Sequence, residues 1–132
     1  MKEQLRVGVI GLGMGRHHLR EYATNPQVKV VALCDQNEQL LAEFLAQHAN
    51  AKDYTSYEKM LAAGGLDAVS VALPNFLHAP VVIAALKAGC HVLCEKPMAL
   101  NATEAEAMLA ASKAAGKKLM IHFNYRFSAP SQ

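Results

Sequence analysis

Residues 7–18 read VGVIGLGMGRHH, an apolar run that breaks into alternating glycines just before a helical pattern. A strand that turns on glycines into a helix points backbone N–H groups and the positive end of the helix dipole at one spot. Such a spot is an anion site, and it suits a pyrophosphate. Gly11 would make the tight turn, and Gly13 would let a phosphate approach the backbone where a Cβ would block it.

The glycine spacing departs from the dinucleotide-binding fingerprint G-x-G-x-x-G. The third glycine of that fingerprint would fall at Arg16, but the chain has Gly15 one residue earlier. Either the turn is one residue shorter, or Arg16 replaces the glycine and the helix packs less closely. A third alternative is a tight connection that binds no nucleotide. The turn residues that would hold the cofactor are Gly11, Leu12, Gly13, Met14 and Gly15.

Composition limits the class of protein. The chain has 132 residues, enough for one domain, with 52% hydrophobic and only 18% charged residues. The net charge is +2 and the basic residues are scattered, which argues against a nucleic-acid partner. The three cysteines form no disulfide framework. Without a signal peptide or a long apolar run, we expect a cytoplasmic protein that contacts no membrane.

Strand patterns alternate with helical patterns along the whole chain. We expect strands at residues 5–10, 28–34, 52–55, 67–73, 91–94 and 118–123, with a helix in each connection, the first from about 16 to 24. This order predicts an α/β, Rossmann-type doubly wound parallel sheet with helices on both faces. Ligands of such sheets bind outside the carboxyl ends of the strands. We therefore expect residues 1–132 to form one dinucleotide-binding domain.

Asp35 ends the second predicted strand, about twenty residues after the glycine turn. A carboxylate at this place can accept hydrogen bonds from both hydroxyls of an adenosine ribose. It would also repel a 2′-phosphate, and Gln36 and Asn37 offer no cation to offset the repulsion. We therefore expect NAD rather than NADP as the cofactor. The alternative is an aspartate that only caps a helix or a turn.

Several histidines and cysteines need a separate interpretation. Cys90, His91 and Cys94 are spaced like metal ligands, but strand alternation sends the two cysteines to one face and the histidine to the other. We therefore predict buried thiols and no metal site. His17 and His18 open the first helix, where we expect them beside the phosphates or on the surface.

Lys96 lies between Glu95 and Pro97 at the end of the fifth predicted strand. The proline stiffens the backbone there and holds the lysine beside the expected ligand crevice. Partial burial would make its ammonium group usable as an acid. The alternative is an ion pair with Glu95 in a loop.

Three further runs carry a family resemblance: ALPNFLHAP at residues 72–80, AGCHVLCEKP at 88–97 and NYRF at 124–127. With the glycine turn and Asp35, they make the chain similar to the glucose–fructose oxidoreductase/inositol dehydrogenase (Gfo/Idh/MocA) family over nearly its whole length. The resemblance implies an NAD(P)-dependent dehydrogenase that acts on a sugar, inositol or related polyol. It implies a catalytic Lys96 beside the nicotinamide, and cofactor contacts from Leu73, Pro74, Asn75, His78, Glu95 and Asn124.

In that family a second domain supplies a proton-transferring histidine, most substrate contacts and the oligomer interface, so the resemblance also implies a homo-oligomer. The present chain ends at Gln132, where the crossover into that domain would begin. We therefore expect the cofactor domain alone, inactive by itself.

Two other functions stay open from the sequence. Methyltransferases that use S-adenosylmethionine often have a G-x-G-x-G turn and an acidic residue after the second strand, although their chemistry does not need Glu95-Lys96-Pro97. A regulator that senses a dinucleotide without catalysis would use the same fold.

Overall fold

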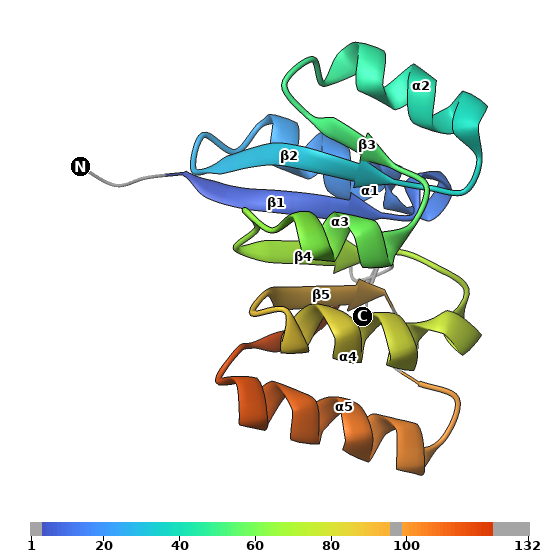
Figure 1. The fold of residues 1–132 in the computed structure, drawn as a ribbon, viewed down its shortest axis with the longest axis vertical. Coiled ribbons are helices and arrows are strands. Elements are labelled where there is room, and N and C mark those ends of the chain that lie inside the picture. Colours follow the sequence, from blue (N-terminus) through green and yellow to red (C-terminus); the bar gives the residue numbers. More distant parts are fainter. Residues whose placement is uncertain (1–3, 96–98, 123–132) are drawn as a thin grey trace, which may run out of the picture.

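The computed structural model describes residues 4–95 and 99–122, which form one sheet with helices on both faces. Six parallel strands follow the order β3-β2-β1-β4-β5-β6 (Figure 1). The strands are β1 (Leu5–Ile10), β2 (Val28–Cys34), β3 (Lys52–Tyr54), β4 (Ala68–Val71), β5 (His91–Glu95) and β6 (Leu119–His122). The helices are α1 (Leu12–Ala23), α2 (Glu38–Gln47), α3 (Tyr57–Ala63), the short 3-10 helix η1 (Asn75–Leu77), α4 (His78–Lys87) and α5 (Ala102–Ala115). This arrangement confirms the predicted Rossmann fold.

The helices form two layers. Figure 1 shows α3, α4 and α5 on the near face of the sheet and α1 on the far face, where α2 contacts α1. The strand order reverses at β1, which has β2 on one side and β4 on the other. The carboxyl ends of these strands therefore form the edge at which a doubly wound fold binds ligands.

Local sequence explains where most helices begin. Asn37, Ser56 and Asn101 each accept a hydrogen bond from the backbone N–H three residues further on, so each is the N-cap of its helix. Gly116 ends α5 in the left-handed conformation with φ of 67°. No described helix is long and apolar enough to cross a membrane.

The predicted boundaries are wrong in one important place. We expected the first helix to begin near residue 16, but α1 begins at Leu12, directly after Gly11. The Gly15 N–H donates to the Gly11 carbonyl at 2.9 Å, so the later glycines lie inside the first turn of the helix. Smaller differences affect the fourth strand, which covers only Ala68–Val71, and β5, which extends to Glu95.

The core confirms the alternation predicted for the cysteines. Cys90 and Cys94 are buried in the cluster between the sheet and the α3–α5 layer. The half-buried His91 ring instead accepts a hydrogen bond from the Lys118 N–H at 3.0 Å. Burial, and next the Glu95 carboxylate, raise the pKa of the Cys94 thiol to about 12. Among the described residues, no three His, Cys, Asp or Glu side chains gather as metal ligands would.

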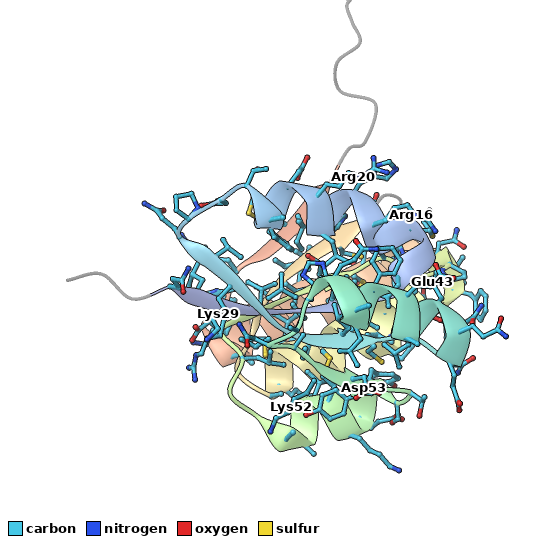
Figure 2. The ribbon with its side chains drawn as sticks, turned by 90° about the horizontal axis from the view of Figure 1, so that it is seen from above. Arg16, Arg20, Lys29, Glu43, Lys52 and Asp53 are labelled. Atoms are coloured by element: carbon cyan, nitrogen blue, oxygen red, sulfur yellow. The ribbon has the colours of Figure 1, made fainter. Side chains whose placement is uncertain are left out.

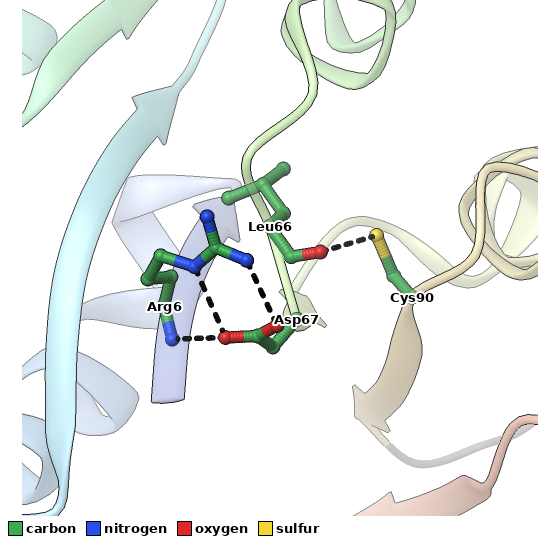
Figure 3. Close-up of polar contacts among 4 residues, drawn as sticks. All are labelled: Arg6, Leu66, Asp67 and Cys90. Atoms are coloured by element: carbon green, nitrogen blue, oxygen red, sulfur yellow. Dashed lines mark hydrogen bonds and ion pairs between the residues drawn. The ribbon is translucent and has the colours of Figure 1, made fainter. Parts of the chain in front are cut away.

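The amino edge of the sheet is fastened by an exposed ion pair. The Arg6 guanidinium contacts the Asp67 carboxylate at 3.2 Å, and the Arg6 backbone N–H donates to the same carboxylate at 2.8 Å (Figure 3). Arg6 lies on β1 and Asp67 directly precedes β4. The pair therefore joins two central strands at the end of the sheet opposite the carboxyl edge.

Candidate cofactor site

A cleft of about 530 Å³ opens at the carboxyl edge of the sheet. Its walls come from the ends of β1 and β2, the start of α3 and the loop after β4. The lining includes Asp35, Gln36, Tyr57, Leu73, Pro74 and Phe76. None of the described residues that line it is lysine, arginine or histidine. The cleft thus lies where the fold predicts a nucleotide, and its described lining carries the acids Asp35 and Glu58 without a cation.

Gly11 makes the turn from β1 into α1, as predicted. Its φ of 93° is a left-handed conformation that favours glycine. A Cβ at this position would overlap the carbonyl oxygen of Ala72, which follows β4. The Gly11 N–H donates to the carbonyl of Cys34 at 2.9 Å. Only glycine can therefore bring the turn this close to the neighbouring strands.

Gly15 decides between the two interpretations of the short turn. A Cβ at Gly15 would lie 2.8 Å from Cγ1 of Val9 and 3.4 Å from Cβ of Ala72, so its absence lets α1 pack closely on β1 and β4. Arg16 points outward instead, with its guanidinium 5.7 Å from the centre of the Phe44 ring on α2 (Figure 2). The turn is one residue shorter, and Gly15 is its packing glycine.

Gly13 and Met14 are exposed in the first turn of α1. A Cβ on Gly13 would meet no atom within 4 Å, so the fold itself does not require glycine there. N–H groups in the first turn of an α-helix have no carbonyl partner inside the helix and suit an anion. The open space at Gly13 therefore fits the approach of a phosphate.

Asp35 lines the cleft and also accepts hydrogen bonds from the protein backbone. One carboxylate oxygen accepts a hydrogen bond from the Leu12 N–H, and the other accepts one from the Asn37 N–H, both at 2.8 Å. The turn aspartate considered in the sequence analysis is therefore present. It does not compete with ribose binding, because each carboxylate oxygen has a second lone pair.

The loop after β4 carries the predicted residues Leu73, Pro74, Asn75 and His78 in two different settings. Leu73 and Pro74 line the cleft, and Asn75 is exposed at the start of η1. His78 is only 1% exposed, and its Nε2 donates to the Leu73 carbonyl at 2.7 Å. The histidine side chain thus holds the loop from inside the protein.

At the end of β5, Glu95 is buried with 2% of its surface exposed. Its carboxylate accepts a hydrogen bond from Nε2 of His18 on α1, which is 1% exposed. The expectation that His18 lies at the surface or beside the phosphates is therefore wrong, whereas His17 is exposed as expected. Lys96 and Asn124, also predicted as site residues, lie outside the described residues.

Some residues of the cleft were missed by sequence reasoning. Tyr57 and Phe76 line it, although no site role was predicted for Tyr57 and Phe76 stood only within the family run at residues 72–80. Both follow the carboxyl end of a strand closely, and that position was the available signal. Cys34 also lines the cleft, where burial first, then Asp35 and Glu58, raise the pKa of its thiol to about 12.

Known proteins are similar to this chain in both sequence and fold. Residues 5–123 match the family model GFO_IDH_MocA, described as "Oxidoreductase family, NAD-binding Rossmann fold". D-glucoside 3-dehydrogenase of Escherichia coli (strain K12) is 35% identical over 130 residues, which cover 97% of this chain and 37% of that protein. The chain thus spans little more than a third of that relative.

Two solved structures show the same architecture. The WlbA dehydrogenase from Bordetella pertussis in complex with NADH and UDP-GlcNAcA has a TM-score of 0.87 at 31% identity, over 92% of this chain and 36% of that one. KijD10, a 3-ketoreductase from Actinomadura kijaniata in complex with NADP and TDP-benzene, has a TM-score of 0.85 at 31% identity, over 93% and 38%. With the glycine turn, Asp35 and the cleft in place, the chain belongs to the Gfo/Idh/MocA oxidoreductase family and forms an NAD(P)-binding Rossmann domain of it.

Proposed function

We propose that the cleft binds NAD in preference to NADP, and that the chain holds it for hydride transfer to or from a sugar, inositol or related polyol. The observation that carries the cofactor preference is Asp35 at the end of β2, in a cleft whose described lining contains no cation. Relatives have been solved with NADH and with NADP, so the preference rests on this chain's own residues.

The geometry of the cleft supports a place for the adenosine half of the cofactor. The free lone pairs of Asp35 would accept hydrogen bonds from the ribose hydroxyls, with the adenine in the cleft beside Tyr57 and Pro74. The pyrophosphate would lie over the first turn of α1, where Gly13 leaves open space. Asp35 also fixes this turn by accepting a hydrogen bond from the Leu12 N–H, so one side chain would contribute to both the ribose site and the pyrophosphate site.

The position of β5 at the same edge supports the proposal for the reaction half of the site. The nicotinamide supplies the hydride chemistry when bound, and the protein contributes orientation and electrostatics. Lys96, which directly follows β5, would hold or deliver the proton at the reacting oxygen. Asn75 and Glu95 belong to the same edge of the sheet. Because the chain spans only 37% of its sugar-oxidising relative, we propose that substrate contacts, a second proton-transferring group and a homo-oligomer interface belong to another part of the protein.

Isothermal titration calorimetry with NAD, NADP and S-adenosylmethionine tests the proposal. We expect saturable binding of NAD, at least about tenfold weaker binding of NADP, and no binding of S-adenosylmethionine. Equal affinity for NAD and NADP would overturn the cofactor preference. Binding of S-adenosylmethionine alone would overturn the assignment of the cleft to a dinucleotide.

A further inference from the structure

Helix α1 is attached to the centre of the sheet by two side-chain hydrogen bonds, one buried and one part-buried. His18 and Tyr22 lie four residues apart, on the same face of the helix. His18 donates to the carboxylate of Glu95 on β5, and the Tyr22 hydroxyl is hydrogen-bonded to the hydroxyl of Ser70 on β4. Ser70 has no exposed surface, His18 is 1% exposed and Glu95 is 2% exposed. Besides the Leu12 contact with Asp35 at its N-terminus, α1 thus has two directional side-chain contacts with separate strands.

Such polar contacts contribute less to stability than apolar packing does, and more to the precise position of the helix. Burying a carboxylate is unfavourable unless it is paired, and a buried polar pair often contributes less to stability than an apolar pair of the same size. A hydrogen bond is sensitive to distance and angle, whereas apolar contact is not directional. The His18–Glu95 pair therefore fixes the position of α1 along the sheet more than it stabilises the fold.

The pair also lies between the two halves of the proposed cofactor site. The strand register pairs Ile10 with Val71 and Val71 with Cys94, so the next row across the sheet holds Gly11, Ala72 and Glu95. One end of this row is the glycine turn that begins α1. The other end is the last residue of β5, which Lys96 follows directly in the sequence.

We propose that His18 is a positioning residue that ties the reaction end of the cofactor site to the glycine turn. By holding the Glu95 carboxylate, it fixes the carboxyl end of β5, at the edge where the nicotinamide would lie. The inference rests on the proposed function, because it requires a dinucleotide that extends from α1 to the end of β5.

Two ligands separate this role from general support of the fold. ADP-ribose contains the adenosine and the pyrophosphate and lacks the nicotinamide, whereas NADH reaches both halves. In a His18→Leu variant we expect NADH to bind about tenfold more weakly, as after loss of a hydrogen bond to a charged group, and ADP-ribose to bind within about twofold of the parent. The rise in NADH fluorescence on binding should also decrease.

Matched variants complete the test. His18→Gln keeps an N–H donor near the position of Nε2 and should restore most of the NADH affinity. His17→Leu changes the exposed neighbour on the same helix and should leave both affinities unchanged. If His18→Leu does not fold, the double variant His18→Leu with Glu95→Met removes both partners of this hydrogen bond instead of one. It should show the same selective loss.

The outcomes are distinct. Equal weakening of NADH and ADP-ribose would mean that His18 acts only through the turn or the fold, and would overturn the inference. Unchanged NADH affinity in a folded His18→Leu or double variant would overturn it as well. A parent chain that binds neither ligand would instead refute the proposed function, and this inference with it.

Discussion

Cofactor choice can be inverted at two neighbouring positions if Asp35 acts as we propose. In the parent chain a 2′-phosphate would carry about −1.5 to −2 charges near the Asp35 carboxylate. Two unit charges 4 Å apart repel by about 1 kcal/mol in water and about 4 kcal/mol near a protein surface. Asp35 is half-buried at an open cleft, so the lower part of this range applies. The repulsion should disfavour NADP by at least about tenfold.

The variant that tests this combines Asp35→Ser with Gln36→Arg. It removes the carboxylate and places a cation on an exposed residue that lines the same cleft. Serine is too short to replace the acceptor of the Leu12 N–H, so α1 loses a contact at its N-terminus that is worth about 0.5–2 kcal/mol. This loss weakens both cofactors alike. The informative quantity is therefore the ratio of the two dissociation constants.

Calorimetry with NAD and NADP gives that ratio for the parent, for the double variant and for a third protein, Asp35→Asn. We expect it to favour NAD by about tenfold in the parent and NADP by about tenfold in the double variant. Asp35→Asn removes the charge at constant size, adds no cation and should give a ratio close to one. High salt should reduce the preference of the parent, because added ions screen charges at an open surface. A ratio that stays the same in all three proteins would refute the electrostatic reasoning.

Three further predictions concern the turn and the opposite edge of the sheet. Gly13→Val should abolish NAD binding in calorimetry without loss of the fold, because its Cβ meets only open space; unchanged affinity would place the phosphates elsewhere. Gly15→Ala brings a Cβ to 2.8 Å from Cγ1 of Val9 and should lower the free energy of unfolding by about 1–3 kcal/mol in a denaturant titration; an unchanged midpoint would contradict close packing there. The Arg6 hydrogen bonds lower the pKa of Asp67, so the pair stabilises the fold above the unfolded pKa near 3.8, and this contribution is lost as the pH falls through the lower folded value. Arg6→Ala should therefore reduce stability at pH 7 more than at pH 2 in thermal unfolding, and equal losses at both would contradict it.

The residues proposed to bind the cofactor and those that would bind the substrate lie in different parts of the protein. The residues proposed for the adenosine and phosphates come from the β1-α1-β2 unit and from loops that line the cleft. D-glucoside 3-dehydrogenase matches 97% of this chain with only 37% of its own length. The WlbA structure, solved with NADH and UDP-GlcNAcA, and the KijD10 structure, solved with NADP and TDP-benzene, match this chain over 36% and 38% of their own lengths. Under the proposed function, cofactor choice would be encoded near Asp35, and substrate choice would be encoded outside the matched region.

Local patterns predicted the order of the elements, the glycine at the turn and the acid after β2, because each depends on residues close together in the sequence. The predicted start of α1 was wrong for a physical reason. Three glycines in five residues disfavour a helix locally, but the contact of Gly15 with Val9 and Ala72 stabilises one, and that contact joins separate elements.

The burial of His18 was missed because its partner Glu95 is 77 residues away in the chain. A signal was nonetheless present once the helix is taken to begin at Leu12. Helical spacing then places His18 on the face of Gly15, Leu19 and Tyr22, of which the first two are buried against the sheet. A histidine three residues after the packing glycine must therefore find a polar partner inside the protein, because an unpaired buried ring nitrogen is unfavourable. Glu95 is a buried acid at the end of β5, where it satisfies this requirement.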